Sequence, residues 1–159
     1  MLTERIKNIN RDYLPKSYLF SPKWIVLGVN NVCNLHCKMC DVGTQNMDSN
    51  FAQNLVGTHP MNMPLDLIKR IIDDTVKYYP KSKLAYGFTE PLVYPDLISS
   101  LQYAQEKGLK TAITTNALTL KQKASKILEA GLSEIFISLD GTQDVHNEIR
   151  GHQKSYQKA

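Results

Sequence analysis

Short apolar runs alternate regularly with longer amphipathic segments, and this alternation most constrains the possible fold. The apolar runs, rich in β-branched and aromatic residues, predict four strands, over residues 24–30, 83–88, 110–115 and 134–139. The segments between them predict three helices, over residues 63–80, 95–108 and 119–131. Strands that alternate with helices are typical of a parallel sheet joined by right-handed helical crossovers. We therefore predict an α/β fold.

Boundary signals support the three helices. Pro64 suits the first turn of the first helix, and Gly108 is a natural end for the second. In the third helix, Thr119 and Gln122 have the spacing of a capping box, and Gly131 follows the last turn. The side chains expected to face the core are Ile68, Ile71, Ile72, Val76 and Tyr79 in the first helix and Leu97, Ile98, Leu101 and Ala104 in the second.

Two segments interrupt this rhythm. Residues 41–63 show no clear period, and their position beside a cysteine cluster favours a functional loop over a disordered one. Residues 151–159 look like the start of a further helix with Ser155 as its N-cap, and the chain stops within the first turn. We therefore expect residues 23–159 to be the N-terminal portion of a longer core domain, preceded by an extension over residues 1–22.

Polar residues follow each predicted strand. The sequences are "NNVCNLHCKMC" after the first strand, "TEP" after the second, "TNA" after the third and "DG" after the fourth. Because the carboxyl ends of parallel strands meet at one edge of a sheet, these segments are expected to form a single functional rim.

All three cysteines of the chain, Cys33, Cys37 and Cys40, lie within this rim. An odd number of cysteines cannot all form disulfides, and a reducing compartment would keep them as thiols or metal ligands. Three thiolates on a four-iron cluster leave one iron open to a substrate or cofactor. A structural zinc site instead needs a fourth ligand, for which the candidates are His36, His59, His146 and His152.

Charge and hydropathy exclude several classes of protein. The net charge of +4 is mild and the lysines are scattered, which argues against a nucleic-acid partner. No apolar run is long enough to span a bilayer, and the N-terminus lacks the apolar core of a signal peptide. We expect a cytoplasmic protein with no membrane partner. An amphipathic N-terminal stretch with Ile6, Ile9 and Leu14 is expected to pack on the domain.

The cysteine spacing, with Met39 just before the third cysteine, resembles that of the radical S-adenosylmethionine (radical SAM) superfamily. "TEPLVYPDL" (89–97), "ITTNALTL" (113–120) and "ISLDGTQDVHNEIRG" (137–151) resemble the family's segments after the second, third and fourth strands, in the same order. The last of these is most similar to members with SPASM or twitch domains and to molybdenum-cofactor synthases. The resemblance implies a partial (β/α)6 TIM-like barrel, of which about four β/α units are present.

The sequence departs from the family pattern at two turns. Phe88 and Thr89 stand where the family usually has Gly-Gly, and Ala117 replaces the glycine of "TTNG". Each replacement restricts the local backbone, because glycine alone adopts positive φ without steric cost.

The resemblance also implies cofactors and partners. Cys33, Cys37 and Cys40 would hold a [4Fe–4S] cluster whose open iron binds S-adenosylmethionine. After one-electron reduction by a flavodoxin- or ferredoxin-type partner, the cofactor would yield a 5′-deoxyadenosyl radical, which abstracts hydrogen from a peptide or small-molecule substrate. The implied cofactor contacts are Met39 (adenine), Thr89 and Glu90 (methionyl ammonium), Thr115, Asn116 and Ser138 (ribose or carboxylate), Asp140 (ribose or substrate) and Arg150 (carboxylate).

Simpler interpretations stand beside these. The chain as a whole is alternatively a zinc module, or a cluster-bearing electron-transfer module without catalysis. Met39 is alternatively plain core, and Glu90 an ordinary solvated carboxylate. Thr115, Asn116 and Asp140 are alternatively capping or turn residues, and the histidines surface or structural groups.

Overall fold

The computed structural model describes residues 5–6, 9, 22–56 and 59–159. Its four strands are β1 (Trp24–Leu27), β2 (Lys83–Tyr86), β3 (Thr111–Thr115) and β4 (Glu134–Ile137). They form one sheet in the order β1-β2-β3-β4, and all three pairings are parallel. The predicted α/β fold with a parallel sheet is therefore confirmed. Three of the strands end earlier than predicted because the residues beyond them leave the ladder to build the rim.

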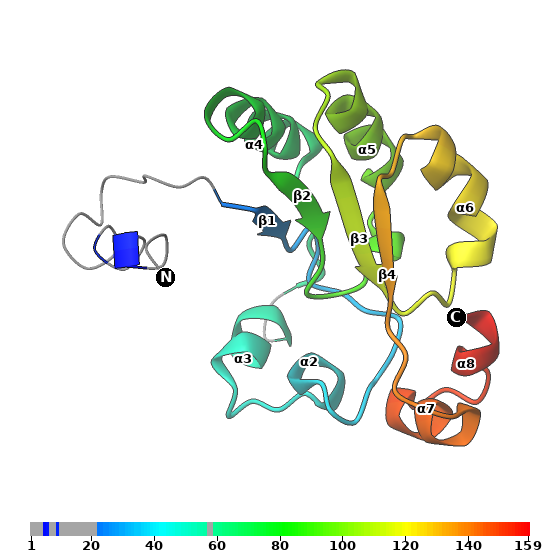
Figure 1. Ribbon diagram of the computed structural model, residues 1–159. Helices are drawn as coiled ribbons and strands as arrows, with labels where there is room; N and C mark the ends of the chain where they lie inside the picture. Colours follow the sequence, from blue (N-terminus) through cyan, green and yellow to red (C-terminus); the bar gives the residue numbers. More distant parts are fainter. Residues whose placement is uncertain (1–4, 7–8, 10–21, 57–58) are drawn as a thin grey trace.

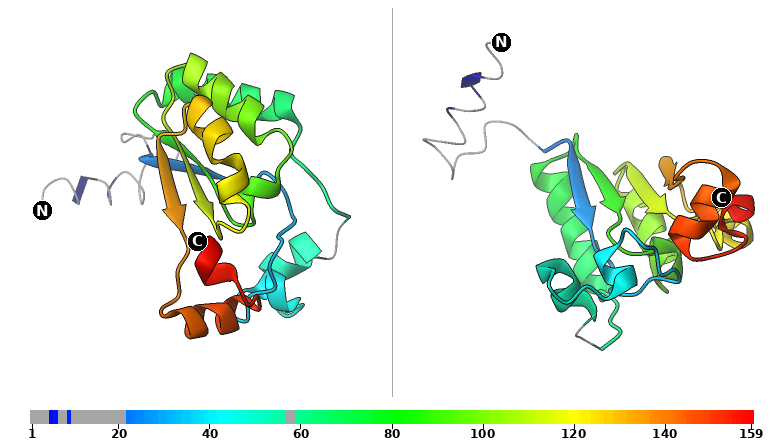
Figure 2. Two further views of the ribbon diagram at one scale, coloured as in Figure 1. Left: turned by 90° about the vertical axis from the view of Figure 1, so that its right-hand side faces the viewer. Right: turned by 90° about the horizontal axis from the view of Figure 1, so that it is seen from below.

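The predicted helices are α4 (Leu65–Tyr78), α5 (Leu97–Glu106) and α6 (Leu120–Glu129). All three cover one face of the sheet (Figures 1 and 2). The core between helices and sheet contains fully buried apolar side chains, among them Ile68, Ile72, Leu84, Leu97, Leu101, Ile113 and Ile127. Gly108 and Gly131 end α5 and α6 in the left-handed conformation, with φ of 72° and 81°.

The predicted capping box of α6 is wrong. Thr119 is the N-cap residue, but its ψ of 7° is not extended, and its side chain makes no capping hydrogen bond. Its main-chain carbonyl instead accepts from the Gln122 N–H at 3.2 Å. An extended N-cap would turn the side-chain oxygen toward these N–H groups, so this backbone conformation explains the loss of the cap.

Several short elements lie at the carboxyl ends of the strands (Figure 1). They are α2 (Asp41–Thr44), α3 (Asn50–Val56), η1 (Pro91–Val93), α7 (Gln143–Arg150) and α8 (Ser155–Lys158). The segment expected to be a loop over residues 41–63 therefore contains two helices. Ser155 is the first residue of α8 rather than its N-cap, which is Lys154. The Ser155 hydroxyl instead bonds Asn147 Oδ1 and the His152 carbonyl, at 2.9 and 3.0 Å.

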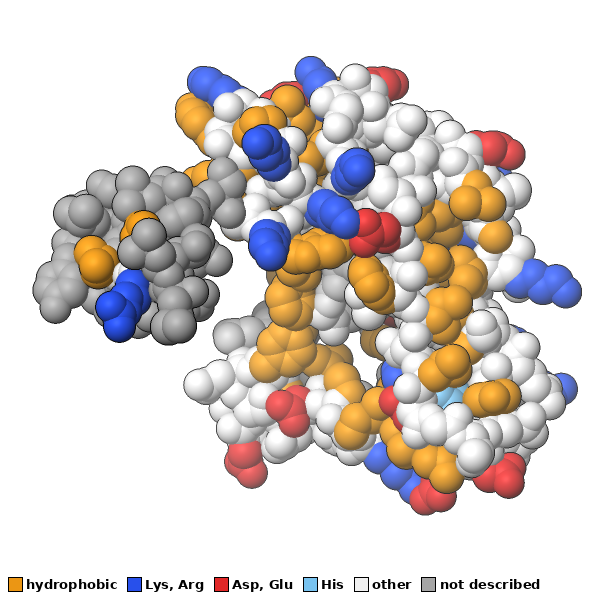
Figure 3. Space-filling view, viewed as in Figure 1, with side chains coloured by type: hydrophobic (Ala, Val, Ile, Leu, Met, Phe, Trp, Pro, Cys, Tyr) orange, Lys and Arg blue, Asp and Glu red, His pale blue; other side chains and the backbone are white. Residues whose placement is uncertain are grey.

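The sheet is strongly curled. Trp24 on β1 and Phe136 on β4 belong to the two outer strands, yet their rings meet edge to face with centroids 6.2 Å apart. Lys83 on β2 forms an ion pair with Glu134 on β4 and lies 4.9 Å above the Trp24 ring. Hydrophobic side chains gather on the sheet face that α4–α6 leave uncovered (Figure 3). This curvature is the geometry of a partial barrel.

In the part of the chain that the structure describes, no helix has both the length and the apolar character needed to cross a membrane.

The prediction that residues 1–22 form an extension lies largely outside the described residues, as does the packing of Leu14. Ile6 and Ile9 are both exposed.

Candidate functional site

A pocket opens where the four strands end, as the arrangement of the rim predicts. Its walls come from the cysteine loop, the ends of β2, β3 and β4, and the last residue of α7. The lining residues are Cys33, Cys37, Met39, Cys40, Val42, Phe88, Thr89, Glu90, Thr114, Thr115, Asn116, Ser138 and Arg150. The structure thus brings together the three cysteines and seven of the eight predicted cofactor contacts, while Asp140 lies behind the pocket wall.

The cysteine loop is tightly built. All three cysteines are free thiols, and Cys37 is buried. The Cys40 N–H donates to the Cys37 carbonyl at 3.1 Å, and α2 starts immediately after Cys40. A Cβ on Gly43 would lie 2.7 Å from the Cys37 nitrogen, so only glycine lets α2 approach the loop this closely. Within the described ranges, no three His, Cys, Asp or Glu side chains are grouped tightly enough to hold a metal ion.

The environment of two of the thiols, Cys33 and Cys37, opposes their ionisation. Burial raises the pKa of Cys33. Burial also raises the pKa of Cys37, against the opposing charge and hydrogen bond of Arg150. Thiolates are the ligand form of cysteine, and an iron–sulfur cluster would supply the positive charge that deprotonation needs here. The donor set of three free thiols at one pocket fits a cluster with one open iron.

Glu90 ties the end of β2 to the end of β3. The side chain is 1% exposed, so the interpretation as a solvated carboxylate is wrong. Its Oε1 accepts from the Leu92 N–H at 2.9 Å and from the Thr115 hydroxyl at 2.7 Å, and its Oε2 accepts from the Asn116 N–H at 2.9 Å. Because a carboxylate has about four acceptor positions, one remains for a ligand in the pocket.

Asn30 supports this corner of the pocket, and sequence reasoning missed it. The Thr89 hydroxyl lies 2.9 Å from the Asn30 carbonyl and 2.5 Å from its side-chain oxygen. The Asn30 side-chain amide donates to the Glu90 carbonyl at 3.1 Å. Asn30 stands directly before the cysteine loop, so these contacts fix the loop against the end of β2. The only signal in the sequence was its position directly before the cysteine motif.

Asn116 links β3 to the cysteine loop. Its Nδ2 donates to Asn34 Oδ1 at 2.7 Å and lies 3.8 Å from the sulfur of Cys33. Its Oδ1 accepts from the Leu118 N–H at 3.0 Å, which is the turn-capping role given above as the alternative. One side chain therefore caps a turn and contacts the cysteine loop.

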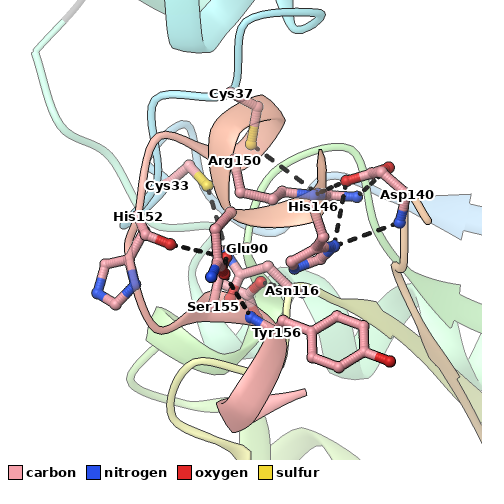
Figure 4. A network of polar contacts seen from close by, with 11 residues as sticks. Cys33, Cys37, Glu90, Asn116, Asp140, His146, Arg150, His152, Ser155 and Tyr156 are labelled. Atoms are coloured by element: carbon pink, nitrogen blue, oxygen red, sulfur yellow. Dashed lines mark hydrogen bonds and ion pairs between the residues drawn. The ribbon is translucent and has the colours of Figure 1, made fainter. Parts of the chain in front are cut away.

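Asp140, His146 and Arg150 form a second polar cluster behind the pocket (Figure 4). Arg150 donates to both carboxylate oxygens of Asp140, at 2.5 and 3.0 Å, and its Nη1 lies 3.9 Å from the sulfur of Cys37. The Asp140 carboxylate raises the pKa of the Arg150 guanidinium against the effect of burial. His146 is buried, whereas His36 and His59 are exposed, in line with surface or structural roles.

Met39 and the residues that replace glycines of the family pattern also lie at the pocket or its turns. Met39 is 57% exposed and lines the pocket, so it is not a core residue. Phe88 and Ala117, which replace glycines of the family pattern, do adopt positive φ, at 70° and 62°, whereas Thr89 does not. The exposed ring of Phe88 lines the pocket and contacts Phe51 of α3, with ring centroids 6.2 Å apart.

Comparison with known proteins shows which family has this architecture. The family model described as "Radical SAM superfamily" matches residues 28–159. Among curated proteins, Fe-coproporphyrin III synthase of Methanosarcina barkeri is 31% identical over 136 residues, which cover 85% of this chain and 31% of that protein. GTP 3′,8-cyclase of Campylobacter lari is 34% identical over 119 residues, 74% of this chain and 34% of that protein.

A solved structure shares the fold. SuiB of Streptococcus suis, bound to S-adenosylmethionine, matches with a TM-score of 0.66 and 22% identity, over 98% of this chain and 35% of that one. A second structure of SuiB, bound to its precursor peptide SuiA, matches with a TM-score of 0.65. The chain spans about a third of the length of the curated relatives it matches.

Proposed function

Since this chain belongs to the radical SAM superfamily, we propose that it forms the part of an enzyme that binds a [4Fe–4S] cluster and S-adenosylmethionine. The observation that carries the proposal is the convergence of Cys33, Cys37 and Cys40 on one pocket with the polar groups of three strand ends. When bound, cluster and cofactor together supply the reductive cleavage that gives a 5′-deoxyadenosyl radical for hydrogen abstraction.

The roles of the pocket residues follow from their chemistry. The three thiols would hold the cluster. The one acceptor position left on Glu90, beside Thr89, suits a methionyl ammonium. Arg150 is a cation at the pocket wall and suits a carboxylate. We assign Thr115, Asn116 and Ser138 to the ribose or carboxylate, Met39 to the adenine and Asp140 to the ribose or substrate.

The reductant, the substrate and the location are proposed for the enzyme as a whole. We propose a flavodoxin- or ferredoxin-type reductant and a peptide or small-molecule substrate. The cytoplasm is the proposed location, because three free thiols in one loop suit a reducing compartment.

Anaerobic reconstitution with iron and sulfide tests the proposal. The protein would be reduced with dithionite, its EPR spectrum recorded with and without S-adenosylmethionine, and 5′-deoxyadenosine assayed. We expect a cluster signal that changes when the cofactor is added, together with formation of 5′-deoxyadenosine. The matched control is the triple variant C33S/C37S/C40S, which should bind no cluster.

Two other outcomes correspond to the alternatives. A normal cluster spectrum that ignores S-adenosylmethionine would keep the family assignment but make this chain a cluster-bearing part that does not by itself cleave the cofactor. A colourless protein with one zinc per chain would contradict the radical SAM function for this chain.

A further inference from the structure

Two N–H donors from distant parts of the chain reach the cysteine sulfurs. Asn116 Nδ2, at the end of β3, lies 3.8 Å from the Cys33 sulfur, and Arg150 Nη1, at the end of α7, lies 3.9 Å from the Cys37 sulfur. Figure 4 shows both side chains directed at the thiols. Each donor is separated from its cysteine by more than 80 residues in sequence, so these contacts are products of the fold.

The Arg150 guanidinium is held in place from behind. Asp140 accepts from its Nε and Nη2 in a bidentate pair, which leaves Nη1 directed at Cys37. Bidentate pairing fixes the plane of a guanidinium as well as its position. Arg150 is therefore oriented before any ligand enters the pocket.

His146 in turn holds Asp140. The ring is 1% exposed and packs edge to face on Tyr156, with centroids 5.8 Å apart. Its Nδ1 lies 3.2 Å from the Asp140 main-chain nitrogen and 3.4 Å from the Asp140 carboxylate. A main-chain N–H can only donate, so Nδ1 is the acceptor and the closer contact is the hydrogen bond.

The end of α7 is also docked on the cysteine loop itself. The Lys38 N–H donates to the Ile149 carbonyl at 2.8 Å, and the Lys38 ammonium pairs with Glu148 at 2.8 Å. The main-chain bond joins the residue after Cys37 to the residue before Arg150 and so keeps the donor and the sulfur together.

We propose that Arg150 and Asn116 donate hydrogen bonds to the cluster thiolates of Cys37 and Cys33 and raise the cluster's reduction potential, with His146 as a positioning residue for Arg150. The inference rests on the proposed function, because it presupposes a cluster on these cysteines. Reduction adds one electron from the external reductant, and no bond to the protein forms or breaks. A cation and N–H donors beside the sulfurs stabilise the added negative charge and therefore favour the reduced cluster.

This role is separable from binding of the cofactor carboxylate. Only three of the five N–H groups of Arg150 are engaged by Asp140 and Cys37, so a carboxylate can bind to the others. A midpoint potential measured without S-adenosylmethionine reports the thiolate contact alone, whereas the affinity for S-adenosylmethionine reports the carboxylate contact.

The test is an EPR-monitored redox titration of the reconstituted full chain without S-adenosylmethionine. For R150Q, we expect a cluster that is about tenfold harder to reduce, a lowering of about 59 mV for a one-electron couple. N116S, which is too short to reach Cys33, should lower the midpoint by less. H146L should lower it in the same direction, and H146N, whose amide oxygen can replace Nδ1 as acceptor, should restore it.

The matched control is D144N, which neutralises an exposed carboxylate in the first turn of the same helix, away from the cysteine loop, and should leave the midpoint unchanged. Should R150Q fail to retain its cluster, R150K decides the matter, because it keeps the positive charge but cannot form the bidentate pair with Asp140 that directs an N–H at Cys37, and it should also lower the midpoint. A wild-type midpoint in whichever of the two variants retains its cluster would overturn the inference. Absence of a cluster from the wild-type chain would instead overturn the proposed function.

Discussion

At the scale of single residues, Phe88 stores backbone strain at the pocket wall. Its φ of 70° lies in the left-handed region, which costs an L-residue about 1–2 kcal/mol. The ring is 62% exposed, so its removal forfeits little burial. We predict that F88G increases the free energy of unfolding by about 1 kcal/mol, after the greater chain entropy of glycine is subtracted. Urea denaturation followed by circular dichroism measures this change.

The control for strain at this position is F88A, which removes the ring but retains a Cβ at the same φ. It should be no more stable than the wild type. Equal stabilisation by F88A and F88G would show that the ring, and not the backbone conformation, is unfavourable.

Glu90 is a residue whose structural role can be measured apart from any cofactor. Its carboxylate accepts from three donors in a site that is 1% exposed. E90Q places an amide N–H against at least one of these donors, and an unsatisfied buried polar group costs about 1–3 kcal/mol. We predict a loss of stability of that size in the metal-free protein by urea denaturation. E148Q, on an exposed carboxylate, should change stability little, and equal effects of both substitutions would contradict the assigned network.

Sequence reasoning identified the residues with motifs, and missed those whose role arises from contacts between distant segments. The cysteines and the strand-end residues were predictable because parallel strands bring their carboxyl ends together. Asn30 and Asn34 lie in the cysteine segment without a predicted role of their own, and His146, although part of the matched segment 137–151, was predicted only as a zinc ligand or a surface or structural group. They become part of the site only when β2, β3 and α7 meet the cysteine loop.

At the scale of elements, α7 couples the end of β4 to the cysteine loop through its last turn. Gly151 ends this helix at φ 65°, and a Cβ there would lie 3.1 Å from the His36 carbonyl oxygen. We predict that G151A costs about 1–2 kcal/mol in strain and also weakens retention of the cluster, because the helix end must withdraw from the loop. Thermal denaturation and the iron content after gel filtration measure the two effects.

Gly108 provides a matched comparison, since its φ of 72° is similar and nothing lies within 4 Å of its missing Cβ. G108A should cost similar strain and leave the iron content unchanged. Equal iron contents in both variants would argue that α7 does not stabilise the cysteine loop.

The three long helices that sequence predicted are those with a periodic apolar face. α4, α5 and α6 each have 10 or more residues and pack apolar side chains on the sheet. α7 has eight residues, of which only His146 is buried, so no apolar stripe marks it. α2 and α3 are shorter still, at four and seven residues. Their helical form depends on packing beside the cysteines, which a periodicity search does not detect.

At the scale of the whole molecule, curvature of the sheet decides whether four strand ends can face one pocket. Neighbouring strands lie about 4.8 Å apart, so a flat four-stranded sheet would separate its outer strands by roughly 14 Å. Side chains stand roughly perpendicular to a sheet, so on a flat sheet two rings on the outer strands would keep about that separation, yet the ring centroids of Trp24 and Phe136 are 6.2 Å apart. The sheet is therefore curled far enough to turn the cysteine loop after β1 toward Arg150 beyond β4.

Trp24 is the only tryptophan of the chain and reports this curvature directly. We predict that F136A shifts the Trp24 fluorescence maximum to longer wavelength, because the ring loses its apolar partner and gains contact with water. F51A is the control, since Phe51 contacts Phe88 at the pocket and should leave the emission unchanged. Unchanged emission in F136A would mean that the outer strands do not approach in solution. The convergence of the strand ends on one pocket would then need another explanation.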